Sequence, residues 1–166
     1  MLPEPSKNRR APLLCWDLFA VQYNSLMQAA NEQQESVRAV RELARNNKWS
    51  REQLQEAIDN MHAYVVVVTD KLQRIAFTGQ GFFEMTGYSG EEAKGRNPKF
   101  LQGAATNRMN TGLVKQQLNQ NEPSEIILEN YRKNGELYLC KILIKPVFNM
   151  RRQLVNYIAY EQEIAA

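Results

Sequence analysis

The chain contains few cysteines and histidines, and this scarcity excludes several kinds of site. Its 166 residues include two cysteines, Cys15 and Cys140, and one histidine, His62. Two cysteines on segments of different type do not form a disulfide framework. One histidine and two separated cysteines also lack the ligand spacing of a zinc or iron centre, so we expect no metal site.

The sequence has no long apolar run and no strong charge of either sign. No stretch approaches the roughly 20 apolar residues that span a bilayer, and the N-terminus lacks the pattern of a signal peptide. The net charge is +3, and the basic runs at residues 7–10 and 151–152 contain no aromatic residues. We therefore expect a cytoplasmic protein that binds neither membrane nor nucleic acid.

Enzyme motifs are also missing. The sequence contains no phosphate-binding loop, no nucleophile paired with a base and no metal-ligand spacing, so we predict that the protein is not an enzyme. Its hydrophobic content of 43% and charged content of 23% are typical of a globular chain. The length suits one domain with an appendage.

The N-terminal part predicts a disordered start followed by a helical extension. Residues 1–12 hold three of the six prolines, which predicts disorder. Residues 13–62 carry apolar stripes at helical spacing, and two interpretations stay open: one long helix, or two with a break near Asn31–Gln34. Ser50 and Gln53 have capping-box spacing, which predicts the start of a further helix.

From Tyr64 onward the pattern predicts a sensor-sized α+β domain over residues 63–163. The expected strands are 64–69, 74–78, 125–133, 136–147 and 154–162, and the expected helices are 80–87, 89–93, 97–101 and 108–119. The pair Asn134-Gly135 predicts a type I′ hairpin turn, which needs φ > 0 at both positions. This order implies a five-stranded antiparallel sheet with helices across one face, preceded by the N-terminal helices.

The last three expected strands are apolar on both faces, so both faces need a cover. The covers available are the N-terminal helices or a second copy of the chain. The helix around Leu14–Ala30 carries more apolar surface than a free helix tolerates. It is therefore expected either to form a homodimer or to dock a partner, or else to pack on its own sheet.

Residues 95–103 read Gly-Arg-Asn-Pro-Lys-Phe-Leu-Gln-Gly. This stretch resembles the signature Gly-x-Asn-Cys-Arg-Phe-Leu-Gln-Gly of the light-oxygen-voltage class of PAS domains. The resemblance covers about residues 63–163, and the family's order of strands and helices matches the order expected here. It implies a PAS fold, a bound flavin mononucleotide (FMN) and a role in signal transduction.

In that family the motif cysteine attacks the flavin under blue light, and here Pro98 stands at its position. Proline has no thiol, so an adduct at that position is chemically impossible. Asn97 and Pro98 also suit the start of a helix, as cap and first residue. Asn97, Gln102 and Asn130 match the family's polar flavin contacts residue for residue, although Asn97 could serve only as a cap.

Four further positions depart from the family pattern. Lys99 and Lys115 stand where the family has two phosphate-binding arginines; they keep the charge but lose the bidentate fork. Cys140 replaces an asparagine that contacts the polar edge of the ring, and it could equally be a small core residue. Glu161 replaces a glutamine that both donates and accepts, so it must be neutral or paired with a cation if a standard flavin is bound.

Two functions follow from the resemblance. The first is a sensory module that binds FMN without a covalent bond and signals by light- or redox-driven flavin reduction. Its output would pass through dimer contacts, made by the N-terminal helices or the outer sheet face, or to a separate effector protein, because the sequence contains no effector motif. The alternative is a ligand-free PAS module for interaction or dimerisation, with a vestigial flavin pocket.

Overall fold

The computed structural model describes residues 15–165, with side chains from Leu18 onward. The disordered start predicted for residues 1–12 lies outside the described residues. The chain separates into two compact units, one up to Gln34 and one from Glu35. In the described part of the chain, no helix has the length and apolar character needed to cross a bilayer.

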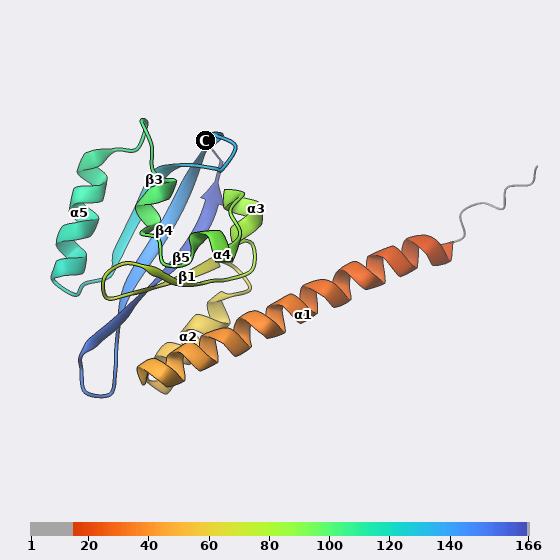
Figure 1. The fold of residues 1–166 in the computed structure, drawn as a ribbon, viewed down its shortest axis with the longest axis horizontal. Helices are drawn as coiled ribbons and strands as arrows, with labels where there is room; N and C mark the ends of the chain where they lie inside the picture. The colour runs from red at the N-terminus through yellow and green to blue at the C-terminus, as the bar shows by residue number, and fades with distance from the viewer. Residues whose placement is uncertain (1–14, 166) are drawn as a thin grey trace, which may run out of the picture. The chain divides into compact units, whose positions relative to one another are not determined.

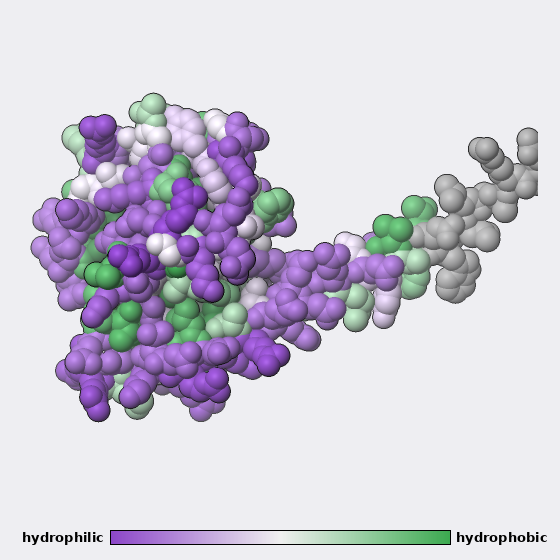
Figure 2. All heavy atoms as spheres, in the orientation of Figure 1, coloured by the Kyte–Doolittle hydropathy of each residue, from purple (hydrophilic) through white to green (hydrophobic). Residues whose placement is uncertain are grey.

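The N-terminal extension begins with one continuous helix, α1 (Cys15–Asn47). The single-helix interpretation is therefore confirmed, and no break occurs near Asn31–Gln34. Hydrophobic side chains stand out on the N-terminal part of α1 (Figure 2). The helix ends where Lys48 adopts a left-handed backbone conformation, with φ of 56°.

The second helix, α2 (Arg51–Asn60), begins with the predicted capping box. The Ser50 hydroxyl accepts a hydrogen bond from the Gln53 amide at 3.2 Å, and the Gln53 side chain accepts one from the Ser50 amide at 3.1 Å. These bonds satisfy two backbone donors that a helix start would otherwise leave unpaired.

Five antiparallel strands form one sheet (Figure 1). The strands are β1 (Val65–Asp70), β2 (Ile75–Thr78), β3 (Ser124–Tyr131), β4 (Leu137–Phe148) and β5 (Leu154–Ile164), in the spatial order β2-β1-β5-β4-β3. Between β2 and β3 the chain forms α3 (Phe82–Thr86), α4 (Gly90–Ala93), the 3₁₀ helix η1 (Pro98–Leu101) and α5 (Arg108–Asn119). The α+β fold class predicted from the sequence is confirmed.

The β3–β4 hairpin differs from the predicted type I′ turn. Gly135 has φ of 88°, but Asn134 is not among the described residues with positive φ. The Gly135 amide instead donates to the Arg132 carbonyl at 2.9 Å, and the Asn134 side chain accepts from the Glu136 amide at 3.0 Å. The type I′ prediction was wrong because this side-chain bond supports a wider turn, with only glycine in the left-handed region.

One face of the sheet is covered by the chain's own helices. Within the unit from Glu35, the last turns of α1, the residue Trp49 and the helix α2 pack on this outer face. The buried cluster consists of Val40, Ala44, Trp49, Ala57, Val66, Val68, Val147, Ile158 and Tyr160. The sequence left two possible covers for this face, the N-terminal helices or a second copy of the chain, and at this part of the sheet the cover is the helices. This explains why β5 carries apolar side chains on both faces.

The opposite, inner face carries two smaller buried clusters. One joins β1 and β2 to α3, α4 and η1 around Val67, Phe82 and Leu101. The other lies on β3 and β4 around Leu128 and Ile142. The inner face of β5 lies between the two clusters, and the candidate functional site is located there.

Candidate functional site

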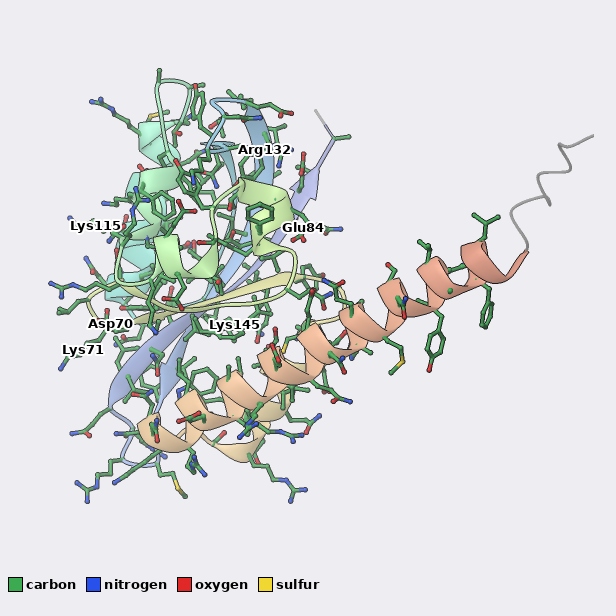
Figure 3. The ribbon with its side chains drawn as sticks, turned by 45° about the vertical axis from the view of Figure 1, so that its right-hand side comes forward. Asp70, Lys71, Glu84, Lys115, Arg132 and Lys145 are labelled. Carbon is green, nitrogen blue, oxygen red and sulfur yellow. The ribbon has the colours of Figure 1, made fainter. Side chains whose placement is uncertain are left out.

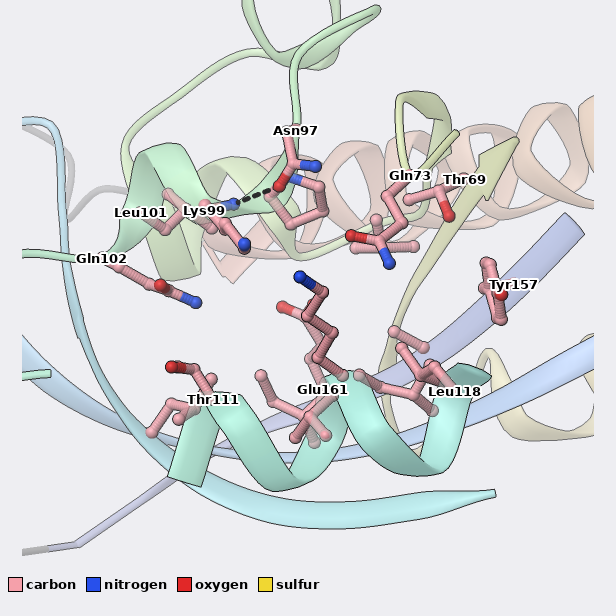
Figure 4. A pocket seen from close by; sticks show the side chains of 18 of the residues that line it. Thr69, Gln73, Asn97, Lys99, Leu101, Gln102, Thr111, Leu118, Tyr157 and Glu161 are labelled. Carbon is pink, nitrogen blue, oxygen red and sulfur yellow. Dashed lines mark hydrogen bonds between the residues drawn. The ribbon is translucent and has the colours of Figure 1, made fainter. Parts of the chain in front are cut away.

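A cavity of about 180 Å³ lies between the inner face of the sheet, α5 and η1 (Figure 4). That volume would hold on the order of ten water molecules at roughly 15 Å³ each, so it admits a small organic ligand. Apolar side chains of the sheet, of η1 and of α5 form most of the wall: Val67, Leu101, Val114, Leu118, Leu128, Ile142, Ile144 and Ala159. Seven of the eight residues predicted from the sequence also line it: Asn97, Pro98, Lys99, Gln102, Lys115, Asn130 and Glu161.

The motif residues enter the cavity from η1. The Asn97 side chain caps this helix by accepting a hydrogen bond from the Lys99 amide at 3.1 Å, and Pro98 occupies the first helical position. The cap holds Pro98 and Lys99 over the cavity, as Figure 4 shows for Asn97 and Lys99. Within the motif, the Arg96 guanidinium lies 3.7 Å from the Phe100 ring centroid, a cation–π contact that stabilises the start of η1.

Gln102 and Asn130 are 28 positions apart in the sequence, and the backbone joins them. The two residues form an isolated antiparallel bridge between the end of η1 and β3. The next residue must be glycine, because a Cβ atom at Gly103 would clash with the Tyr131 ring. The Thr106 hydroxyl then donates to the Glu129 carbonyl and accepts from the Gly103 amide, which fastens this loop to β3.

Asn130 carries a buried acceptor without a protein partner. Asn130 is 3% exposed, and no described residue donates to its Oδ1 atom at normal hydrogen-bond distance and angle. Tyr138, the residue opposite it on β4, also has a buried hydroxyl without such a bond. An unsatisfied buried acceptor costs about 1–3 kcal/mol. Because Asn130 also lines the cavity, a bound molecule with an N–H or O–H donor would remove that cost.

Glu161 is a buried carboxyl group on the central strand of the sheet. It is 5% exposed and lies between Val65 of β1 and Ile142 of β4. The nearest polar side-chain atom with a hydrogen-bond geometry is the Cys140 sulfur, 4.0 Å from Oε2. Burial raises the pKa of Glu161 to about 7, because removing water disfavours the charged form.

Cys140 is the predicted site residue that does not line the cavity. It is fully buried in the β3–β4 cluster, with its sulfur 4.0 Å from Oε2 of Glu161. Burial, with the Glu161 carboxyl as a second cause, raises the pKa of the thiol. Cys140 is therefore placed as a protonated core residue and not on the cavity wall, and its predicted contact with a ligand ring stays a prediction.

The two lysines at the site come from different elements. Lys99 on η1 and Lys115 on α5 are both exposed and both line the cavity (Figure 3 labels Lys115). In the chain from Leu18 to Ala165, neither makes an ion pair with a carboxylate. Both cations are therefore available to an anionic group at the rim.

Sequence reasoning missed several polar residues of the wall: Thr69, Gln73, Thr111, Asn119 and Tyr157. Gln73 lies in the β1–β2 turn with φ of 59°. Asp70 shapes this turn, because its carboxylate accepts from the amides of Leu72 at 2.8 Å and Arg74 at 2.9 Å. Asp70 followed by a short polar stretch was the available signal for a turn, but nothing in the sequence indicated that the turn reaches over the cavity.

The antiparallel sheet, the short helices on its inner face and the cavity between them define the architecture of a small α+β domain. The family model described as a PAS domain matches residues 62–166. The chain therefore belongs to the PAS domain family.

Proteins similar to this chain include blue-light photoreceptors, in agreement with the resemblance carried by the motif. A blue-light photoreceptor of Listeria innocua is 34% identical over 93 residues, covering 54% of this chain and 37% of the relative. A blue-light-activated histidine kinase of Brucella canis is 31% identical over 90 residues, covering 54% of this chain and 18% of the relative. The chain thus matches well under half the length of these relatives.

Solved structures agree in fold. A light-oxygen-voltage domain studied with a flavin analogue superposes with a TM-score of 0.63 at 26% identity, covering 70% of this chain and 87% of that one. The light-state structure of the Aureochrome1 light-oxygen-voltage domain superposes with a TM-score of 0.60 at 25% identity, covering 63% and 85%.

Proposed function

We propose that residues 63–163 form a light- or redox-responsive sensor domain that binds FMN without a covalent bond. The single observation that carries this proposal is Asn130, a buried acceptor without a protein partner on the wall of a cavity. A flavin ring offers an N–H donor on its polar edge, flanked by carbonyl acceptors. The resemblance assigns Asn130 to such a contact, and the donor set of this pocket suits it.

The other residues of the cavity suit the remaining parts of FMN. The apolar wall formed by the sheet and α5 would hold the flat ring and exclude water from it. Lys99 and Lys115 would attract the phosphate at the rim as point charges, without the fork of an arginine. When bound, the flavin supplies blue-light absorption and reversible reduction.

Pro98 excludes a covalent adduct between the motif position and a bound flavin. It lines the cavity at the motif position that carries a nucleophilic cysteine in the family, and it has no thiol. The protein's own contribution would then be to orient the ring, to shield it from water and to hold hydrogen bonds that change with its redox state. We propose that no residue of the cavity has a catalytic role, and that the protein is a sensor and not an enzyme.

The signal would leave the domain through β5. This strand carries Glu161 on its inner face, and Ile158 and Tyr160 pack against the helices on its outer face. A change in the pocket could therefore alter the packing of α2 and the end of α1. We propose that the output is received either by a second copy of the chain, through the N-terminal helices or the outer sheet face, or by a separate effector protein. The cytoplasmic location stays a prediction.

The proposal is tested by visible spectroscopy of the purified protein, in the dark and after blue light, with and without added FMN. We expect a structured flavin band in the blue. With an added external electron donor, blue light should reduce the bound flavin slowly, without an adduct spectrum. Asn130→Leu is the matched variant, because it keeps the size of the side chain and removes the acceptor, and it should bind FMN more weakly. Failure of the native protein to take up FMN at any concentration tested would refute the proposal.

The second candidate function is a ligand-free PAS interaction module. The observation that favours it is the combination of three departures from the family pattern: Pro98 and Glu161 on the cavity wall, and Cys140 in the core beside it. A pocket that has lost its ligand would show the same departures. A colourless protein that rejects FMN yet forms a stable dimer would establish this function.

A further inference from the structure

Glu161 has no cation to neutralise it. In the part of the chain whose side chains are described, no ion pair includes this residue. Its strand neighbours Val65 and Ile142 are apolar, and its carboxyl group lies on the wall of the cavity. Burying an unpaired carboxylate is costly, and the usual outcome is that the group takes up a proton instead.

The titratable groups around Glu161 on the sheet come from β4 and β5, and none of them supplies a close positive charge. Cys140 and Tyr138 face it from β4, and burial, as the largest cause, raises the pKa of both, so both stay protonated and neutral. Tyr157 on β5 lines the same cavity. Glu163, two residues further along β5, is paired with Arg132 at 2.6 Å.

The cations of the cavity, Lys99 on η1 and Lys115 on α5, are exposed at its rim. Figure 4 shows Lys99 on the η1 side of the open space, whereas Glu161 belongs to the sheet below it. A side chain that is exposed keeps its ammonium group in water, where it can receive an anion at the entrance. Away from the rim, the polar side chains of the cavity wall include the carboxyl group of Glu161 and the amides of Gln102 and Asn130.

We propose that Glu161, in its neutral acid form, is the hydrogen-bond donor that selects the ligand of this cavity, and that ligand binding is coupled to retention of that proton. The inference rests on the proposed flavin pocket and adds a residue that determines its specificity. A neutral carboxylic acid can donate to a carbonyl oxygen or an imine nitrogen of a heterocycle, whereas a carboxylate can only accept. The pocket therefore takes an acceptor-bearing ring at Glu161 and loses affinity when this acid ionises.

The donor and acceptor of the cavity are then complementary. Asn130 offers an unpaired acceptor and Glu161 offers a donor, so the ligand must present both kinds of group. Because burial raises the pKa of Glu161 to about 7, the proton is held below neutral pH and lost above it. Affinity should thus be highest at mildly acidic pH and should fall tenfold per pH unit well above 7.

The test measures riboflavin binding by fluorescence quenching between pH 5.5 and 9, in the native protein and in Glu161→Gln. Riboflavin is the probe because it lacks the phosphate of FMN, which titrates near pH 6 and would add its own pH dependence. The glutamine amide donates at every pH, so we expect Glu161→Gln to bind with little pH dependence. The native protein should match it at pH 6 and bind at least tenfold more weakly at pH 9.

A second readout does not depend on the ligand. The carboxyl ¹³C resonance that disappears in Glu161→Gln is followed against pH in the ligand-free protein, and we expect its midpoint near neutral pH. A midpoint at the ordinary glutamate value would overturn the neutral acid, and equal pH dependence of riboflavin binding in both proteins would overturn its role as donor. If neither protein binds riboflavin or FMN, the proposed flavin site and the donor role fail together, while the resonance still reports whether Glu161 holds a proton.

Discussion

The indole Nε1 of Trp49 donates a hydrogen bond to Oδ1 of Asn156 at 2.9 Å, across 107 positions of sequence. Asn156 in turn donates from Nδ2 to the Thr69 carbonyl at 2.9 Å. Trp49 follows α1, and Asn156 begins the part of β5 that leads to Glu161. This buried chain of bonds joins the N-terminal helices to the two central strands of the sheet.

Replacing Trp49 by Phe should destabilise the fold by about 1–3 kcal/mol, because it leaves the buried Asn156 acceptor without a donor. Urea unfolding of the native protein and of Trp49→Phe measures the loss. The control is a double-mutant cycle with Asn156→Ala, in which the Trp49 substitution should cost about 1 kcal/mol less. Equal costs in both backgrounds would show that the bond contributes nothing beyond ring packing.

Restoring the cysteine of the family motif should restore adduct chemistry. Pro98 lines the cavity, so Pro98→Cys places a thiol against a bound ring. With FMN bound, blue light should cause a loss of the blue absorption band that reverses in the dark. Pro98→Ser is the control, since it makes the same change of backbone without a thiol, and it should behave like the native protein. An FMN-loaded Pro98→Cys variant without this response would place the ring elsewhere.

Lys99→Gln and Lys115→Gln should each weaken FMN binding about three- to fivefold, because an exposed ion pair contributes up to about 1 kcal/mol. Riboflavin binding should not change, since the lost charge serves only the phosphate. Lys71→Gln, an exposed lysine in the β1–β2 turn, is the matched control and should leave both affinities unchanged. Equal weakening of FMN and riboflavin would contradict the phosphate role.

Glu161→Gln should stabilise the ligand-free protein at alkaline pH. The folded-state pKa is raised from 4.5 to about 7, so the folded protein binds more protons than the unfolded chain in that window, and its stability falls as pH rises through it. The glutamine variant avoids this loss, and its advantage should reach about 3 kcal/mol at pH 8 and vanish below pH 4.5. Unfolding curves at both pH values measure it.

The control for that experiment is Glu84→Gln, an exposed glutamate on α3 (Figure 3). It removes the same charge from the surface and should change stability little at either pH. An equal gain in Glu84→Gln and Glu161→Gln would attribute the effect to net charge instead of burial.

Local patterns in the sequence were sufficient to predict the elements that build the site. The capping box at Ser50, the Asn97-Pro98 helix start and the strand pattern from Tyr64 each depend on neighbouring residues, and the structure contains all three. The motif also identified residues that meet in space, such as Gln102 and Asn130, because a family resemblance carries tertiary information that spacing alone does not.

What the sequence could not predict depends on long-range packing. Nothing near Asn156 in the chain indicates that its side chain meets Trp49. Nothing near Cys140 in the chain indicates that it packs beside Glu161 and off the cavity wall, because that outcome depends on how the strands and helices pack around the cavity. The prediction of a type I′ turn at Asn134 was wrong for a local reason. The Asn134 side chain accepts a hydrogen bond from the Glu136 amide and so competes with the backbone for this donor.

The N-terminal part of α1 offers the last prediction, a homodimer. Leu18 is 72% exposed and Leu26 is 65% exposed, and the sequence has no charged residue between Asp17 and Glu32. An apolar helix face of this kind is stabilised by an apolar partner, and Phe19, Tyr23 and Leu26 recur at the 4,3 spacing of a helix–helix seam. A second copy of the chain presents the same stripe.

Leu26→Glu places a charge in that seam and should convert a dimer to a monomer in sedimentation equilibrium, with the apparent mass falling to that of one 19.2 kDa chain. Met150→Glu is the matched control, because Met150 is also highly exposed, at 84%, but lies in the β4–β5 loop. It should leave the dimer intact. If the native protein sediments as a monomer, the homodimer prediction is wrong. The apolar stripe of α1 would then bind a different partner, and a second copy of the chain could not receive the signal from β5.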